Sequence, residues 1–449
     1  MADIKVCVIG AGSAVFSLNL VRDLVLTPSL YGSCISLVDV NVERLNAVYA
    51  LMKRLCEEVG AKYKLEKAVD RRKALRDADF VVNTALAAGH SRLRDGWAVA
   101  RDLGYRFGGS LHVMHDEAFW INFYQFKLFE EVIEDVLDLC PDAWYIQLAN
   151  PVLAGITLLG RKYPEANIVG LCHGYTGVYY LADAIGLDPA KVEFTAPGLN
   201  HFIWLTEIRV DGEDAYPKVN DWVNNKAVEH WKKCYPSDAL GPKAVDLYRR
   251  FKVFPIGDTC TPGGGSWPWW YHVDEERERK WHEDPESWWA SYFAWLNTRV
   301  SEVLKVAEDP SAKVTENFPL EKSGEDTVPL IESIACNFPR KLQVNVVNRG
   351  YLVPGIPADF EVEVPAIVDG RGVRGLEVEC LPKPVLAFAL RDRVAPVEME
   401  LEAYEGGNKE QLVELVLTDP WTRSSEQAEQ LVEKILRLPF HVDMPKHYR

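Results

Sequence analysis

The stretch that decides the fold is Ile4 to Phe16, which reads IKVCVIGAGSAVF. Its first six residues are mostly apolar and β-branched, and they predict a buried strand. Gly10 and Gly12 follow directly, and apolar residues then recur at helical spacing. This order is typical of a dinucleotide site, because the glycine turn admits a pyrophosphate and the helix N-terminus faces its negative charge. The residues assigned to the cofactor turn are Gly10, Gly12, Ser13, Ala14, Val15 and Phe16.

An acidic residue closes the second predicted strand, Cys34 to Val38. Asp39 is placed to accept hydrogen bonds from the adenosine ribose, which favours NAD over NADP because a 2′-phosphate would be repelled. The third glycine of the full dinucleotide fingerprint is missing, and Val15 stands in its place. The alternative is a glycine turn of another α/β fold, with Asp39 as an ordinary surface residue.

Strands and helical patterns alternate through the first part of the chain. Further strands are predicted at 78–84, 144–148 and 168–171, with apolar residues at helical spacing between them. The alternation predicts an α/β fold with a Rossmann-like, doubly wound parallel sheet. In such a sheet, ligands bind at the carboxyl ends of the strands.

The alternation weakens beyond about residue 190. The sequence therefore predicts two domains. An NAD-binding, Rossmann-like domain is expected at 1–190, and a mixed α+β domain for substrate, metal and oligomerisation at 191–449. The elements predicted in the second domain are strands near 342–347 and 360–364 and helices near 383–404, 408–418 and 424–437.

Charge and composition exclude several classes of protein. The 449 residues carry 50 Lys and Arg against 66 Asp and Glu, a net charge of −16 that would repel nucleic acid and anionic lipid. No run approaches the roughly 18 apolar residues that span a membrane, and the first apolar run ends in glycines rather than at a cleavage site. A cytoplasmic enzyme is expected. The nine cysteines have no regular spacing, which predicts reduced thiols.

Candidate metal ligands follow two other predicted strands. Cys172 and His173 come directly after the strand at 168–171, and His201 precedes another apolar strand. A thiolate and an imidazole from two strand ends form a partial site for a divalent ion, with positions left for substrate oxygens and water. Taken alone, such a pair is more often a core cysteine and a histidine with ordinary hydrogen bonds.

Two further polar residues lie where a ligand could bind. Asn150 ends the strand at 144–148 and could hydrogen-bond a sugar or the nicotinamide, although Asn-Pro is also a common turn. Asp258 is a carboxylate on a glycine-containing loop, which is equally the setting of a turn or a helix cap.

Six motifs occur in order along nearly the whole chain, namely Val8 to Leu18, Ala149 to Pro151, Gly170 to Gly174, Gly198 to His201, Phe254 to Thr259 and Lys322 to Glu325. In this order they resemble glycoside hydrolase family 4. The resemblance is closest to the α-glucosidase and α-glucuronidase branches, which share the Cys-His-Gly and Pro-Ile-Gly-Asp-Thr elements. It implies a fold similar to lactate and malate dehydrogenases, tightly held NAD, a Mn²⁺-type ion, and a homodimer or homotetramer.

The resemblance also implies a redox mechanism of glycoside cleavage. NAD+ takes a hydride from sugar carbon 3, a base removes the acidified proton at carbon 2, the aglycone leaves, water adds and the hydride returns. Cys172 and His201 would bind the metal, and Asp258 would be the base. His173 would be the acid for the leaving group. The substrate-binding residues would be Asn150 and Asn200.

Two departures from related α-glucosidases lie where substrate selection is expected. Those enzymes carry an arginine two residues after Gly-Asp-Thr, and the segment Thr259 to Gly263 contains no arginine. They also carry a Gly-Ile-Asp pattern that the segment Phe107 to Glu117 lacks. No basic cluster suits a phosphate, so an unphosphorylated α-glycoside is predicted, with α-glucosidase as the best match and α-glucuronidase or α-galactosidase as alternatives. The rival classes are an NAD-dependent 2-hydroxyacid dehydrogenase and a non-catalytic sensor of a sugar or a dinucleotide.

Seven of the 14 tryptophans lie between Trp267 and Trp295. Because they closely follow Asp258, a loop and helix bordering the sugar pocket are predicted there, where aromatic faces stack on pyranose rings. Packing in the core or at a subunit interface is the alternative for most of the seven.

Overall fold

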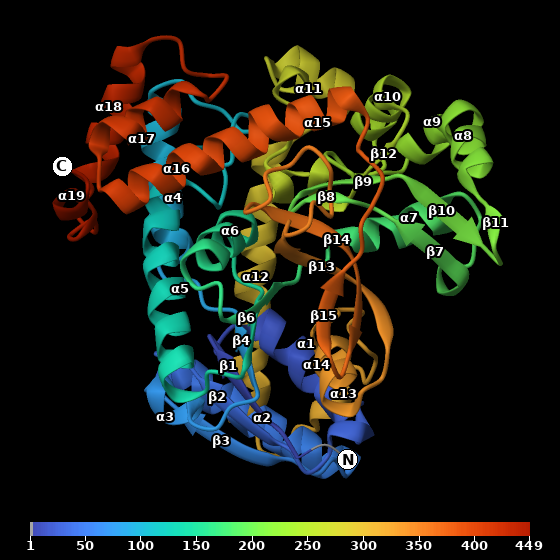
Figure 1. The fold of residues 1–449 in the computed structure, drawn as a ribbon, viewed down its shortest axis with the longest axis vertical. Helices are drawn as coiled ribbons and strands as arrows, with labels where there is room; N and C mark the ends of the chain where they lie inside the picture. The colour runs from blue at the N-terminus through green and yellow to red at the C-terminus, as the bar shows by residue number, and fades with distance from the viewer. Residues whose placement is uncertain (1–2) are drawn as a thin grey trace.

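The computed structural model describes residues 3–449, and the side chains of Ala14, Val15 and Phe16 lie outside that description. Six parallel strands form one half of the main sheet in the order β6-β5-β4-β1-β2-β3 (Figure 1). This is the order of the doubly wound dinucleotide-binding fold, so the predicted α/β class is confirmed. The strands are β1 Lys5–Ile9, β2 Cys34–Val38, β3 Lys64–Ala68, β4 Phe80–Asn83, β5 Trp144–Gln147 and β6 Asn167–Gly170.

The five strands predicted in this half are all present, within two residues of their predicted ends. Strand β3 was not predicted, because its sequence Lys-Leu-Glu-Lys-Ala is mostly polar and half-exposed or exposed. It pairs with β2 at the edge of the sheet, where a strand buries little apolar surface. The helices of this half are α1 Ala14–Val25, α2 Val42–Val59, α3 Arg71–Leu75, α4 Gly89–Asp102, α5 Phe119–Leu139 and α6 Val152–Lys162.

The main sheet continues past residue 190 through antiparallel strands. β13 pairs with β14 and meets β6, and β14 leads through β8 and β9 to β12. The sheet has twelve strands within residues 3–449. It crosses the boundary between 1–190 and 191–449, and that division stays a prediction. The added strands are β8 Gly198–Leu199, β9 Phe202–Leu205, β12 Phe254–Ile256, β13 Arg340–Val347, β14 Glu361–Asp369 and β15 Gly372–Gly375, and a small separate sheet contains β7 Val192–Thr195, β10 Glu207–Val210 and β11 Glu213–Asp214.

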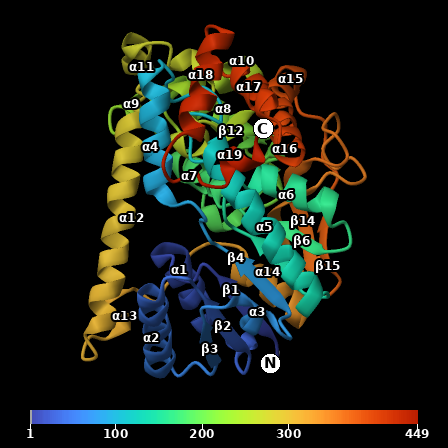
Figure 2. The same ribbon diagram turned by 90° about the vertical axis from the view of Figure 1, so that its left-hand side faces the viewer.

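Helix α12, Pro285–Glu308, extends between the two apolar clusters of the molecule. Figure 2 shows it along one side, from the level of α11, Glu275–Trp281, to that of α13, Val314–Asn317. Trp289 near its start is buried in one apolar cluster, and Val303 near its end is buried in the cluster that includes α2. The first turns of α12 therefore pack beside Trp97 of α4, with ring centroids of Trp97 and Trp289 5.4 Å apart, while its end packs on α2.

The helices predicted towards the C-terminus are present. The one predicted at 383–404 consists of α15 Lys383–Ala389 and α16 Ala395–Gly406, joined by a π-helical turn. No helix in the described part of the chain is long and apolar enough to cross a membrane. The nine cysteines, all within that part, are free thiols, as predicted. The remaining helices are α7 Gly177–Ala184, α8 Tyr216–Asn225, α9 Ala227–Trp231, α10 Pro242–Phe251, α14 Thr327–Cys336, α17 Lys409–Leu417, α18 Ser425–Leu436 and α19 Met444–His447.

Candidate functional site

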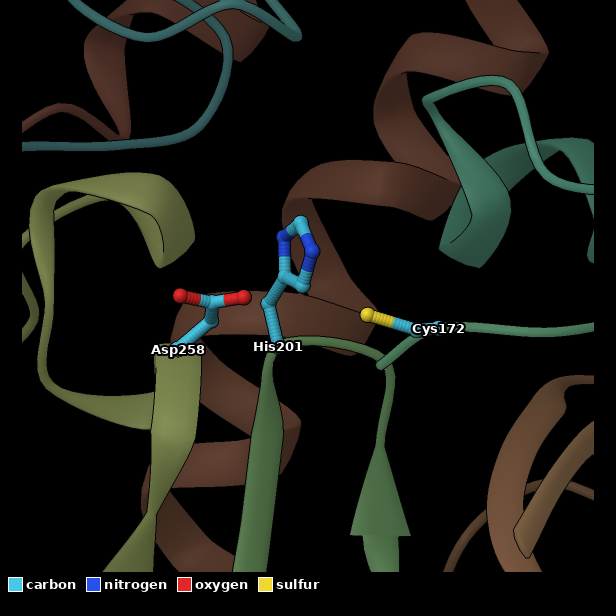
Figure 3. A group of neighbouring side chains, drawn as sticks. All are labelled: Cys172, His201 and Asp258. Carbon is cyan, nitrogen blue, oxygen red and sulfur yellow. The ribbon is translucent and has the colours of Figure 1, made fainter. Parts of the chain in front are cut away.

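Three side chains with metal-binding atoms meet at one end of the main sheet. Cys172 follows β6, His201 lies in the two-residue turn between β8 and β9, and Asp258 follows β12. A sulfur, a ring nitrogen and a carboxylate oxygen from these residues lie within 4.8 Å of one another. Figure 3 shows His201 between the other two, with the Asp258 carboxylate and the Cys172 sulfur directed toward it. The fold thus brings together residues from three separate sequence motifs.

Close backbone contacts hold the loops of this site together. Gly257 has φ +52°, and a Cβ atom there would lie 2.0 Å from the carbonyl oxygen of Gly174. The loop after β12 can touch the loop after β6 because residue 257 is glycine. The Thr259 hydroxyl donates to the Ile203 carbonyl and accepts from the Ile203 amide, both at 2.8 Å. These contacts fix the three loops relative to one another.

Half-buried Cys172 and buried His201 form a pair whose ionisation states depend on each other. Burial raises the pKa of the Cys172 thiol, and His201 opposes that effect. Burial disfavours the charged ring of His201, but contacts with Cys172 and Glu117 outweigh it and raise the pKa of the ring well above its ordinary value. A divalent ion requires thiolate and neutral imidazole, so it would displace protons from the pair. With the Asp258 carboxylate, the donor atoms fit a divalent cation.

Glu117 is a residue of this site that sequence patterns did not predict. It is 2% exposed, and its Oε1 lies 3.4 Å from Nδ1 of His201. Burial would raise the pKa of Glu117, but its contacts with His201 outweigh burial and lower it, which favours the carboxylate. A carboxylate next to the second ring nitrogen orients the histidine in many metal sites. The run of His115, Asp116 and Glu117 was the one local signal for such a role.

Replacing Glu117 by glutamine should weaken binding of a divalent ion at Cys172 and His201. Without the carboxylate the His201 ring is oriented less firmly and is less basic, and such changes lower metal affinity about 10- to 100-fold. Titration of the chelator-treated protein with Mn²⁺ measures the change. The matched control is Glu165→Gln at an exposed position, which should bind Mn²⁺ as the parent does. Equal affinities for Glu117→Gln and the parent would remove Glu117 from the site.

A cavity lies over Cys172, His201 and Asp258. Acidic side chains, apolar side chains and aromatic side chains of α12 form its walls. The described residues that line it are Asp116, Leu148, Asn150, Val152, Leu171, Cys172, His173, His201, Asp258, Gly263, Trp288, Trp289, Tyr292, Glu325, Asp326 and Thr327.

Of the residues predicted to bind substrate or to act as the acid, two line the cavity and one does not. His173 is exposed and lines the cavity, and Asn150 lines it with its amide nitrogen 3.4 Å from Asp116 Oδ2. Asn200 is 1% exposed and is not among the lining residues, and its backbone amide donates to Glu361. The roles assigned to these residues stay predictions.

The glycine turn after β1 lies at the switch point of the parallel strands. A Cβ atom on Gly10, which has φ +83°, would lie 2.6 Å from the backbone of Ala85 after β4. The Gly12 amide donates to Asp39 Oδ2 at 2.7 Å, which places the acid beside the turn. Ser13 makes no side-chain hydrogen bond to the first amides of α1, so these donors can face an anion. The turn therefore fits a dinucleotide. The side chains of Ala14, Val15 and Phe16, which were assigned to it, lie outside the described residues.

Two of the seven clustered tryptophans line the cavity. Trp288 and Trp289 lie on the first turns of α12, and Tyr292 stacks on Trp288 with ring centroids 5.4 Å apart and planes 12° apart. The other five tryptophans of the cluster are not among the lining residues. Trp267, for example, is 1% exposed and packs on Phe202. Two tryptophans of the cluster therefore border the cavity, and stacking on a sugar stays a prediction.

Family models match both halves of the chain. The model described as Family 4 glycosyl hydrolase matches residues 5–186, and the model of the Family 4 glycosyl hydrolase C-terminal domain matches residues 196–422. The chain is 27% identical to an alpha-glucosidase of Erwinia rhapontici, covering 96% of this chain and 97% of the relative. It is 24% identical to an alpha-galactosidase of Bacillus subtilis, covering 95% of each. It is 23% identical to an alpha-galacturonidase of Lachnoclostridium phytofermentans, covering 97% and 96%.

Solved structures share the fold. A 6-phospho-alpha-glucosidase from gut microorganisms, in complex with NAD and Mn²⁺, matches with a TM-score of 0.79 at 17% identity over 97% of each chain. A malate dehydrogenase of Plasmodium falciparum matches with a TM-score of 0.50 at 14% identity, covering 96% of this chain and 99% of the other. The predicted likeness to malate dehydrogenases is confirmed for the fold.

Proposed function

The chain belongs to family 4 of the glycosyl hydrolases, and we propose that it cleaves an unphosphorylated, neutral α-glycoside with NAD+ and a divalent metal ion. The observation that carries the substrate class is the charge of the cavity wall. Four carboxylates line it, and no lysine or arginine is among its lining residues in the described chain. These carboxylates belong to Asp116, Asp258, Glu325 and Asp326.

The proposed cofactors have matching residues in the chain. The turn with Gly10 and Gly12 and the acid Asp39 would hold NAD+, and Cys172 with His201 would hold the metal, for which Mn²⁺ is the first choice. When bound, NAD+ supplies a hydride acceptor and the metal ion supplies a Lewis acid.

The cavity residues would carry the proton transfers. Asp258 would take the proton from sugar carbon 2, because its carboxylate faces the same space as the metal ligands. His173, exposed at the wall, would donate a proton to the oxygen of the leaving group. Asn150 would orient sugar hydroxyls, and Trp288 would offer a face for the pyranose ring.

We expect neutral nitrophenyl α-glycosides to be cleaved far better than uronides or 6-phosphoglycosides. A substrate carboxylate about 5 Å from one of the wall acids would be repelled by about 3 kcal/mol, which lowers kcat/KM about a hundredfold. The measurement is phenol release from α-glucoside, α-galactoside, α-glucuronide, α-galacturonide and 6-phospho-α-glucoside, with NAD+, Mn²⁺ and a reductant each present or omitted.

The same panel separates the proposal from its alternatives. Phenol release that requires both NAD+ and Mn²⁺, and that consumes less than one equivalent of NAD+ per turnover, supports the glycosidase. Faster cleavage of the uronides would contradict the neutral substrate and favour the α-glucuronidase alternative. The relative rates on the two neutral sugars choose between α-glucosidase and α-galactosidase. Accumulation of NADH with simple 2-hydroxyacids would identify the dehydrogenase alternative.

Assembly and location stay predictions. The homodimer or homotetramer implied by the resemblance is tested by light scattering of the purified chain, and a mass equal to that of one chain would contradict it. A cytoplasmic location is also expected.

A further inference from the structure

A second cluster of metal-binding side chains lies outside the cavity. His230, Cys234 and Asp238 occur at four-residue intervals, and their ligand atoms lie within 4.8 Å of one another. A fourth group comes from a distant part of the chain, because Nδ1 of His282 lies 3.3 Å from Sγ of Cys234. These residues share no member with the cavity site.

Two contacts within this cluster match the edges of a tetrahedral zinc site. Zinc bonds of about 2.0 to 2.1 Å to nitrogen and about 2.3 Å to sulfur place ligand atoms about 3.3 to 3.7 Å apart. Nε2 of His230 lies 3.5 Å from Oδ1 of Asp238, and the contact between Cys234 and His282 is 3.3 Å. Two of the ligand pairs therefore already have the spacing that the ion requires.

A buried ring nitrogen in the cluster lacks a hydrogen bond. Nε2 of His230 is inaccessible to solvent and has no hydrogen-bond partner in the described residues, although it faces Asp238. A buried polar atom without a partner costs free energy unless water or an ion satisfies it. This nitrogen is one that a metal ion would bind.

The backbone also holds the cluster in place. His282 ends helix α11 with φ +60°, a left-handed conformation that is uncommon for residues other than glycine. Its carbonyl accepts a hydrogen bond from the Ser237 amide at 2.8 Å. Oδ1 of Asp238 accepts from the Leu240 amide at 2.7 Å, which fixes that carboxylate.

The charged side chains near the cluster are compatible with a bound cation. Lys232 and Lys233 adjoin Cys234 in sequence, but both are exposed, and Lys232 pairs with Glu229. Cys234 and Asp238 supply two negative charges once metal binding has displaced the thiol proton into solvent.

We propose that His230, Cys234, Asp238 and His282 bind one zinc ion. A thiolate and two imidazoles favour zinc over Mg²⁺, Ca²⁺ or Mn²⁺, which prefer oxygen ligands. Four protein ligands leave no position for substrate, so the ion is structural. It ties the segment after α9 to the end of α11, and both helices lie toward the same end of the molecule (Figures 1 and 2).

This zinc site would support the loop that carries Asp258. Cys260, two residues beyond Asp258, is fully buried, and its thiol donates to the carbonyl of Ala239 at 3.8 Å. Ala239 directly follows the proposed ligand Asp238. The inference stands on these contacts and does not depend on the proposed function.

The test uses the full chain with Cys172→Ser, so that the cavity cannot supply a thiolate. Chelator-treated protein is titrated with Zn²⁺ against a chromogenic chelator, and Co²⁺ is added separately to reveal the thiolate-to-metal charge-transfer band. We expect one tightly bound zinc per chain, a thiolate band with Co²⁺, and a higher melting temperature with Zn²⁺.

Adding Cys234→Ser should remove the bound zinc, the cobalt band and the thermal shift. Adding Cys380→Ser instead, at an exposed thiol elsewhere, should change none of them. His230→Asn and Asp238→Asn should each lower zinc affinity while the chain stays folded. The proposal is overturned if the Cys172→Ser chain binds no zinc in competition with the chelator. It is equally overturned if the chain with both serine substitutions keeps the zinc and the band.

Discussion

Replacing Cys172 by serine is expected to abolish metal-dependent glycoside cleavage and to leave NAD+ binding unchanged. Cys172 supplies the sulfur beside His201 and Asp258, and a metal ligand of this kind must be deprotonated. A serine hydroxyl does not give up its proton near neutral pH, so the divalent ion would be held weakly. Turnover should fall by at least about a hundredfold, the scale of losing one group that stabilises charge in a transition state.

Two measurements separate this effect from a general loss of structure. The glycine turn follows a different strand, β1, so NAD+ affinity measured by protein fluorescence should equal that of the parent. Cys380→Ser, at an exposed thiol, should keep full activity. Undiminished turnover of Cys172→Ser at limiting Mn²⁺ would show that the sulfur is not a ligand of the catalytic ion.

The dinucleotide-binding half could be predicted because its local patterns are strong. β1, β2 and β4 are almost wholly buried and occur in the sequence as short apolar runs. Strand β3 carries no such run because it lies at an edge. Strand β8 has only two residues, Gly198 and Leu199, which is too short for any periodicity.

The residue types of the cavity site could be predicted from the sequence, but their proximity in space could not. Cys172 and His201 come together because β13 and β14 pair between β6 and β8, and these strands occur much later in the chain. The approach of Glu117 to His201 depends on the same long-range pairing. The two-residue turn buries Asn200 and presents His201 to the cavity, which depends on backbone angles such as φ +58° at His201.

Asp258→Asn should lower kcat about 10²- to 10⁴-fold, the range for removing a general base. Asparagine keeps the shape of the side chain and can still accept the hydrogen bond that Thr261 donates to Oδ1 at 2.6 Å. It removes the proton acceptor, so exchange of the carbon 2 proton with deuterated solvent should slow by a similar factor. The matched control is Asp102→Asn at an exposed position, which should retain parental rates.

The position of Asp258 also allows a second role, because its carboxylate lies within 4.8 Å of both the Cys172 sulfur and a His201 ring nitrogen. A metal ligand and a base respond differently to added Mn²⁺. If Asp258 is the base, the Mn²⁺ concentration for half-maximal activity stays close to that of the parent and excess Mn²⁺ restores nothing. If Asp258→Asn instead regains turnover as Mn²⁺ is raised, the carboxylate is a third metal ligand. In that case the base must be another cavity acid, and Asp116 is the first to test because it lines the same wall as Asn150.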